Sequence, residues 1–291
     1  MTREEIVAGA RDAIQQGSKS FRAASRLFDP LTRERAWLLY CWCRYCDDVA
    51  DGQTFGFGRG ERGNVEVLRD KTMRAAGGEE LPELPFRALT QLMSERPIPV
   101  RFIEDHLQGF SLDEAEWRPR TSEDLIRYCY HVAGAVGCMM AIVMGVPADD
   151  EETLARAADL GIAFQLSNIA RDIREDAEAG RCYLPLDWLT EFGVDQSDLL
   201  EPANRPALTA MVQRLVDSAQ FHENESRRGV AYLPFRSRLA VLTALRIYGE
   251  IGRRVVRLGP AAWDGRVTVG KVRKFAFVVP SFAEALVAQK R

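Results

Sequence analysis

The hydrophobic residues of this chain recur with the period of an α-helix along nearly its whole length. No stretch shows the sustained polar–apolar alternation of a half-buried β-strand. Prolines such as Pro30, Pro147 and Pro202 fall at or near the ends of the periodic segments, where helices tolerate them. The pattern therefore predicts one all-α domain, residues 1–291, with helices over 3–16, 31–51, 64–76, 83–95, 99–114, 121–145, 149–178, 203–228, 232–258 and 268–289.

Composition and charge narrow the class of protein. With 291 residues, 46% of them hydrophobic, the chain is long enough to bury a large core. Its formal net charge of −3 predicts no nucleic-acid partner. The N-terminus, MTREEIVAGA, lacks the apolar region of a signal peptide, and six cysteines fit a reducing compartment. We therefore expect a cytoplasmic protein.

Two local patterns are rejected as sites. Cys41 and Cys43 in CWCRYC point to opposite sides of a helix, so they cannot easily share a metal ion. The three glycines of residues 58–63 match a dinucleotide-binding pattern, but that pattern works only between a strand and a helix. We therefore expect neither a zinc site nor a nucleotide site there.

The C-terminal end is basic. From Arg246 to Arg291 there are ten Lys or Arg residues against three Asp or Glu, a net charge of +7. Such a segment can attract phosphates or an anionic membrane, or it can simply be a solvated helix face. Peripheral membrane contact is therefore one expectation for this end.

Two helices with apolar surroundings carry matching polar stripes. The helix that ends in DDVAD has, at spacings of four, three and four residues, Tyr40, Arg44, Asp47 and Asp51. The helix containing NIARDIRED has, at spacings of three, four and four residues, Gln165, Asn168, Asp172 and Asp176. Each stripe thus presents two carboxylates one turn apart.

Paired carboxylates suit a hard divalent cation. Mg²⁺ takes oxygen ligands and commonly bridges carboxylates to substrate phosphates, and Mn²⁺ can substitute for it. Arg44 and Arg171 lie beside the two clusters and can hold phosphate oxygens. Surface ion pairs are the simpler explanation for either cluster alone. Two such stripes on apolar helices favour a shared metal and an anionic ligand.

Five motifs together resemble the squalene and phytoene synthase family, most closely its bacterial phytoene synthase branch. They are DDVAD, NIARDIRED, Gly17-Ser-Lys-Ser-Phe21, Tyr128-Cys-Tyr-His-Val-Ala-Gly134 and Gly180-Arg-Cys-Tyr-Leu-Pro185. The likeness covers residues 13 to about 270. It implies a class I isoprenoid-synthase fold around a central apolar cavity, and Mg²⁺-dependent head-to-head condensation of two prenyl diphosphates without NADPH.

The resemblance also implies roles for single residues. Asp47, Asp51, Asp172 and Asp176 match the metal-binding positions, with Gln165 and Asn168 in support. Lys19, Arg44, Arg171 and Arg266 match diphosphate-contacting positions, and Phe21 matches a residue that lines the substrate site. The tyrosines that match positions near the reacting centre are Tyr40, Tyr128, Tyr183 and Tyr248. Gly52 departs from the family, because many relatives have an acid there, but the DxxxD spacing is kept.

The expected substrate is geranylgeranyl diphosphate and the expected product is phytoene, with downstream carotenoid enzymes as possible partners. The same chemistry on farnesyl diphosphate, giving dehydrosqualene or squalene, is the close alternative. A more distant alternative is a non-catalytic helical protein that docks on membranes through its basic C-terminal helix. That protein would neither bind diphosphates with Mg²⁺ nor respond to replacement of Asp47 or Asp172.

Overall fold

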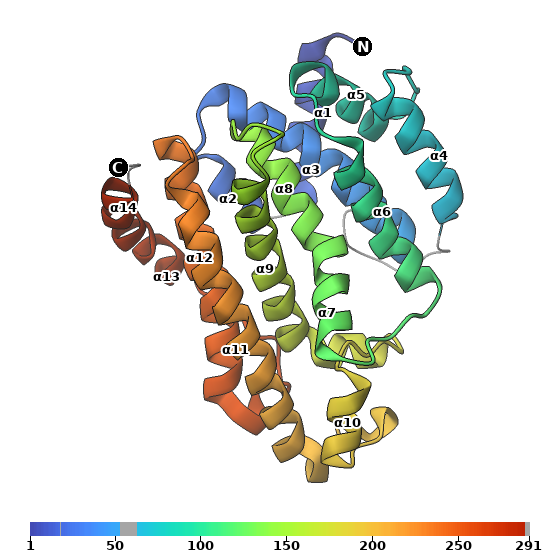
Figure 1. Cartoon of the computed structure of the whole chain (residues 1–291), viewed down its shortest axis with the longest axis vertical. Helices are drawn as coiled ribbons and strands as arrows, with labels where there is room; N and C mark the ends of the chain where they lie inside the picture. The colour runs from blue at the N-terminus through green and yellow to red at the C-terminus, as the bar shows by residue number, and fades with distance from the viewer. Residues whose placement is uncertain (18, 53–62, 289–291) are drawn as a thin grey trace.

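The computed structural model describes residues 1–17, 19–52 and 63–288, and in these residues it contains helices and no strand (Figure 1). The predicted all-α fold is confirmed. The helices are α1 (Arg3–Gly17), α2 (Lys19–Ser25), α3 (Pro30–Asp51), α4 (Val65–Ala76), α5 (Leu84–Glu95), α6 (Val100–Glu114), α7 (Ser122–Cys129), α8 (Ala135–Val143), α9 (Glu151–Glu178), α10 (Leu186–Phe192), α11 (Arg205–Val230), α12 (Phe235–Leu258), α13 (Lys271–Ala276) and α14 (Val278–Val287).

Local sequence explains where the site-bearing helices begin and end. The Asp29 carboxylate accepts hydrogen bonds from the Leu31 and Thr32 amides at 3.1 and 3.0 Å and so starts α3. Gly52 ends α3 with φ of 64°, a conformation that glycine adopts without strain. Asp150 caps α9 by accepting from the Thr153 amide, as the acidic start of that helix predicts.

The structure corrects the predicted helices in four places. Helices α2 and α10 were not expected, because each has only seven residues and too little periodicity. The predicted 232–258 helix begins at Phe235, directly after Pro234. The predicted 268–289 helix is two helices, α13 and α14. Pro280 has no amide hydrogen and is best tolerated in the first turn of a helix, and it lies in the first turn of α14, which starts at Val278.

The predicted 121–145 helix runs as one rod but contains a π-helical turn, Tyr130–Gly134, between α7 and α8. This rod lies against α9 with almost no side chain between the two backbones. A Cβ atom built on Gly161 would be 2.1 Å from the Ala133 carbonyl oxygen, and one built on Gly137 would be 2.2 Å from the Ala157 oxygen. Two glycines therefore set the closest approach of these helices.

Five helices surround the middle of the molecule as a closed ring of neighbours. Helix α8 packs against both α3 and α9, α9 packs against α12, and α12 packs against α2. The ring closes where Phe21 of α2 stacks on Tyr40 of α3, with ring centroids 5.5 Å apart. Figure 1 shows α8, α9 and α12 running side by side along the long axis. The two polar stripes lie on members of this ring, α3 and α9.

In the described part of the chain, one rod, Ser122–Val143, is apolar and long enough to cross a bilayer by composition, but half of its apolar window is buried in the bundle. Burial of that kind is typical of a core helix. The glycine pattern of residues 58–63 lies, apart from Gly63, outside the described residues. All six cysteines are free thiols, as expected.

Candidate active site

The stripe on α9 has the orientation that its spacing predicts. Gln165, Asn168, Asp172 and Asp176 are all half-buried, whereas the apolar residues between them, such as Leu166 and Ile169, are buried in the core. Apolar packing thus fixes one side of α9, and the polar stripe faces away from that packing. The ligand roles of these four residues stay predictions.

Asp172 is the centre of a charged network. The Arg171 guanidinium binds both of its oxygens as a fork, with the Nε–Oδ1 distance at 2.7 Å. Arg266, from the segment after α12, approaches Asp172 Oδ1 at 3.0 Å and Glu175 at 3.4 Å. Two cations implied by the resemblance as diphosphate ligands therefore meet at one carboxylate. Such bidentate geometry is how arginine also recognises phosphate.

Asp176 lies one turn further along α9 in a buried, acidic environment. Burial raises the pKa of its carboxyl to about 7; Arg181, 3.8 Å away, opposes this shift, and the charges of Asp172, Glu175 and Asp113 add to it. Buried carboxylates that repel one another are relieved by a cation. The atoms of these carboxylates that could bind a metal are all oxygens, so the residues fit a hard ion such as Mg²⁺. Among residues 1–17, 19–52 and 63–288, however, no three acidic, His or Cys side chains already converge as a metal cage.

The stripe on α3 is organised around Arg44. Its guanidinium lies 3.5 Å from Asp47 and 3.1 Å from Asp48, a neighbour for which the sequence suggested no role. The Tyr40 hydroxyl, one turn earlier, is buried without a hydrogen-bond partner in the described part of the protein, and burial raises its pKa to about 12. The side chains of Asp51 and Lys19 lie outside the described residues, so their assignments stay predictions.

On the opposite side of the ring, Tyr248 of α12 stacks on Phe164 of α9 with centroids 4.1 Å apart. Burial raises the pKa of the Tyr248 hydroxyl, and the nearby positive charge of Arg171 opposes that shift. Tyr248 therefore lies next to the charged network of Asp172. The two stacked aromatic pairs are Phe21–Tyr40 and Phe164–Tyr248. Together they come from α2, α3, α9 and α12, four of the five helices that surround the middle of the molecule.

Tyr128 and Tyr183 meet at a carboxylate that the sequence did not single out. The Tyr128 hydroxyl donates to both oxygens of Asp113 at 3.0 Å, and the Tyr183 hydroxyl donates to Oδ1 at 3.1 Å. The two rings stack with centroids 4.9 Å apart. Burial and the adjacent Asp113 charge raise the pKa of Tyr128 well above its usual value. Asp113 thus joins the end of α6, helix α7 and the segment after α9.

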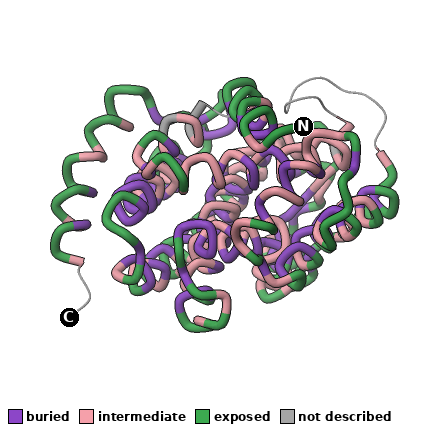
Figure 2. The backbone as a smooth tube through the Cα atoms, turned by 90° about the horizontal axis from the view of Figure 1, so that it is seen from above, coloured by how far each residue is buried: buried purple, intermediate pink, exposed green. Residues whose placement is uncertain are grey.

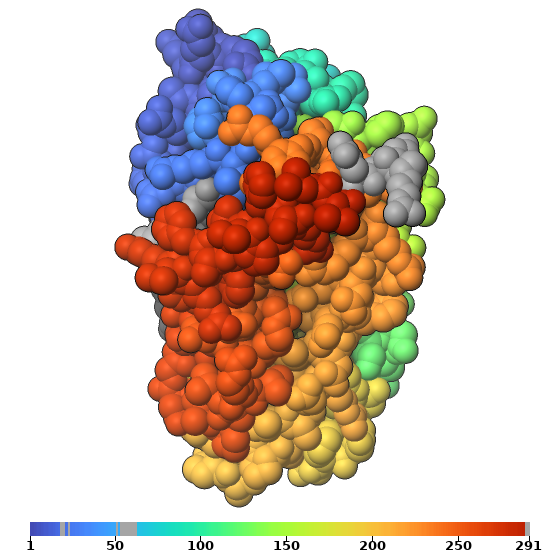
Figure 3. All heavy atoms as spheres, turned by 90° about the vertical axis from the view of Figure 1, so that its left-hand side faces the viewer, coloured from blue at the N-terminus to red at the C-terminus, as the bar shows by residue number. Residues whose placement is uncertain are grey.

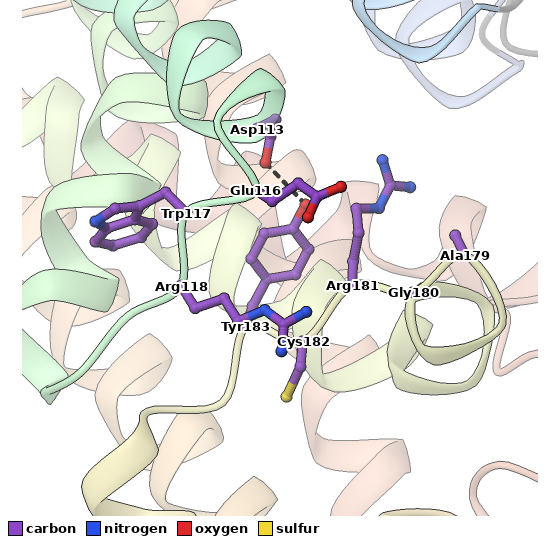
Figure 4. A pocket seen from close by; sticks show the side chains of 9 residues that line it. All are labelled: Asp113, Glu116, Trp117, Arg118, Ala179, Gly180, Arg181, Cys182 and Tyr183. Carbon is purple, nitrogen blue, oxygen red and sulfur yellow. Dashed lines mark hydrogen bonds between the residues drawn. The ribbon is translucent and has the colours of Figure 1, made fainter. Parts of the chain in front are cut away.

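A pocket opens beside this cluster (Figure 4). Its lining includes Asp113, Glu116, Arg118, Arg181 and Tyr183, and Figure 4 shows the Asp113 and Tyr183 side chains joined by their hydrogen bond. Arg181 and Tyr183 come from the GRCYLP motif. The motif therefore brings one cation and one tyrosine to the acidic end of α9.

Comparison with known proteins identifies the family. The family model described as squalene/phytoene synthase matches residues 14–273. The chain belongs to the squalene/phytoene synthase family. Its relatives include a 15-cis-phytoene synthase of Enterobacter agglomerans, 43% identical over 95% of both chains, and one of Pantoea ananas, 41% identical over 100% of this chain and 96% of the relative.

Solved structures give the same fold. A dehydrosqualene synthase in complex with a ligand superimposes with a TM-score of 0.86 at 27% identity, covering 98% of each chain. The squalene synthase HpnC from Alicyclobacillus acidocaldarius superimposes with a TM-score of 0.78 at 24% identity, covering 88% of this chain and 95% of that one. The expected class I isoprenoid-synthase fold is confirmed.

Proposed function

We propose that this chain joins two molecules of geranylgeranyl diphosphate head to head, through a cyclopropyl diphosphate, to form phytoene. It is a prenyltransferase of the phytoene synthase type. The observation that carries the proposal is identity above 40%, over nearly the whole chain, to phytoene synthases. The polar stripes of α3 and α9 and the aromatic pairs Phe21–Tyr40 and Phe164–Tyr248 on the same ring of helices supply groups suited to this chemistry.

The reaction begins when an allylic carbon loses diphosphate. Magnesium bound by Asp47, Asp51, Asp172 and Asp176 would neutralise charge on the departing group, and manganese can take its place. Arg171 and Arg266 add fixed positive charge at Asp172, where the structure already gathers them. Arg44 on α3 would add to this field, and the family resemblance assigns Lys19 the same role.

The allylic cation is then attacked by the double bond of the second substrate, a proton leaves, and a cyclopropane that keeps one diphosphate results. A second loss of diphosphate, rearrangement and loss of a further proton give the hydrocarbon and complete the release of two diphosphates. No reductant enters this balance, so NADPH is not required. Tyr40 and Tyr248 place electron-rich rings near the stripes, where a ring face can stabilise a cation.

Carbocations react with water, so the space inside the helix ring has to be dry. We propose that this space is the central apolar cavity that receives the prenyl chains, with Phe21 and the supporting amides Gln165 and Asn168 near its polar end. The buried Tyr40 hydroxyl, which has no partner among the described residues, supports a ligand at that place.

The chemistry of substrate and product also bears on where the enzyme works and with which partners. Substrate and product are lipids, so we propose a cytoplasmic enzyme that makes peripheral contact with a membrane and passes phytoene to downstream carotenoid enzymes. The structural likeness to a dehydrosqualene synthase supports one alternative function, the same reaction on farnesyl diphosphate. The two differ in the depth of cavity that each substrate needs.

The test is the hydrocarbon product. Purified protein is incubated with geranylgeranyl or farnesyl diphosphate, with and without Mg²⁺, and the extract is identified by chromatography and mass spectrometry. We expect phytoene from the longer substrate, only with metal, and its loss in Asp172→Asn. The matched control is Glu152→Gln, an exposed carboxylate on the same helix. A hydrocarbon from farnesyl diphosphate alone would establish the alternative, and metal-independent turnover would refute the mechanism.

A further inference from the structure

The last two helices present an apolar stripe to solvent instead of to the core. At spacings of three and four residues along α13 and α14, the exposed side chains are Val272 (85% exposed), Phe275 (76%), Val279 (74%), Phe282 (46%) and Leu286 (56%). Phe277, between the two helices, has helix-like backbone angles (φ −69°, ψ −20°), so these spacings continue along one face from α13 into α14. Figure 2 shows this terminal segment at the edge of the molecule, mostly exposed. A contiguous patch of this kind marks an interaction surface.

The opposite face of α14 is attached to the body by polar contacts as well as by the buried Ala285 and the partly buried Val278. Glu284 forms ion pairs with Arg227 of α11 and Arg246 of α12. The Arg238 guanidinium donates to the Ala285 carbonyl oxygen at 2.8 Å. These contacts fix the orientation of α14, so the apolar stripe cannot turn inward without breaking them. Figure 3 shows the terminal helices lying across one face of the molecule.

The patch continues onto α12. Phe282 meets Phe235 edge to face, with ring centroids 5.5 Å apart, and Phe235 is itself exposed. The surface therefore has two aromatic rings at one end and a third, Phe275, near the other. Aromatic and aliphatic side chains on one helix face are typical of helices that lie in the interfacial layer of a bilayer.

Charge decides which occupant fits this stripe. Lys271 and Arg273 flank it on α13, and Arg257 at the end of α12 is 62% exposed on its side chain. Arg273 and Arg257 share one buried carboxylate of α12, Glu250, at 2.9 and 3.8 Å, and Glu284 faces the body, where it is paired with two arginines. The border therefore carries more cations than acids, and an apolar face with a net positive border is complementary to anionic phospholipid.

We propose that the stripe Val272, Phe275, Val279, Phe282 and Leu286 seats the protein in the surface of an anionic lipid bilayer. This inference deepens the membrane contact proposed above, but it does not depend on which prenyl diphosphate is the substrate. It assigns the docking face to α13 and α14 and leaves the Ser122–Val143 rod inside the bundle.

The experiment is sedimentation with sucrose-loaded vesicles, either of phosphatidylcholine alone or with phosphatidylglycerol added. We expect the wild-type protein to sediment with the anionic vesicles. The double variant Phe275→Ser/Val279→Ser should bind at least about tenfold more weakly, because it loses two apolar anchors. Phe221→Ser on α11, an equally exposed ring away from the stripe, should bind as the wild type does. Lys271→Gln should weaken binding to anionic vesicles by about fivefold.

Two further measurements keep the outcomes distinct. Product formation in detergent micelles should be the same for the wild-type protein and the double variant, which separates docking from fold and chemistry. Wild-type protein that ignores anionic vesicles, or a double variant that still sediments with them, would overturn the proposal. So would light scattering that shows a wild-type dimer and a monomeric double variant, because the stripe would then be a contact between two copies of the chain.

Discussion

Replacing Gly161 by alanine tests the close contact between α9 and the rod that carries Tyr128. The added Cβ would lie 2.1 Å from the Ala133 carbonyl oxygen, 2.5 Å from its carbon and 2.7 Å from the Gly134 nitrogen. All three atoms belong to the backbone, so no side chain can rotate away. The two helices have to separate by roughly 1 Å, which loosens the packing on both sides of the contact.

The magnitude follows from two opposing effects. Alanine in place of glycine inside a helix favours folding by roughly 0.5–1 kcal/mol. Overpacking of a rigid contact typically costs about 1–3 kcal/mol, and a clash between two backbones belongs at the upper end of that range. We therefore expect Gly161→Ala to lower the free energy of unfolding by about 2 kcal/mol.

Urea denaturation followed by circular dichroism measures this change. The matched control is Gly252→Ala in α12, where the new Cβ would meet a Val216 methyl carbon at 3.3 Å, a contact that a small side-chain shift can relieve. The control should stay within about 0.5 kcal/mol of the wild type. A Gly161→Ala protein as stable as the control would show that the helices do not touch as described, and the reasoning would fail.

Two other predictions concern the acids of the site. Asp113→Asn keeps one acceptor oxygen for two tyrosine hydroxyls, so we expect its free energy of unfolding, measured by urea denaturation, to fall by about 1–3 kcal/mol and its turnover to fall as well. The control, Glu114→Gln, replaces an exposed side chain and should change neither quantity. Asp176 has a raised pKa in the folded protein, about 7 against 3.8, so without metal its contribution to stability is present at low pH and is lost as the pH rises toward 7. Metal-free Asp176→Asn should therefore gain stability relative to the wild type between pH 4 and 8, measured by urea denaturation in EDTA; a pH-independent difference would contradict the shift.

Local patterns in the sequence were sufficient for the long helices and for the α9 stripe. Helix α9 shows why: its period and its polar face are set within 28 contiguous residues, and its caps, Asp150 and Ala179, directly adjoin them. Local patterns could not predict the contact between Arg266 and this stripe, because Arg266 lies 94 positions after Asp172. The family resemblance was what pointed to Arg266. The structure places the Arg266 guanidinium 3.0 Å from Asp172, and its role as a diphosphate ligand stays a prediction.

Asp113 shows what sequence reasoning lacked. It lies among three carboxylates, Asp113, Glu114 and Glu116, and nothing in their spacing distinguishes the first. Its partners are 15 and 70 residues away, so only the folded chain reveals them. The π-helical turn was missed for a related reason, since a single wider turn barely changes the hydrophobic period.

The hydrogen bonds of Asp113 restrict what Tyr128 and Tyr183 can contribute to the reaction. Each phenolic hydrogen is already given to a carboxylate, and ionising Tyr128 would place a second negative charge beside the first in a buried place. Neither ring is suited to act as a Brønsted base. We therefore expect these two rings to act on a carbocation only through their π electrons, and the released diphosphate to accept the protons that the hydrocarbon loses.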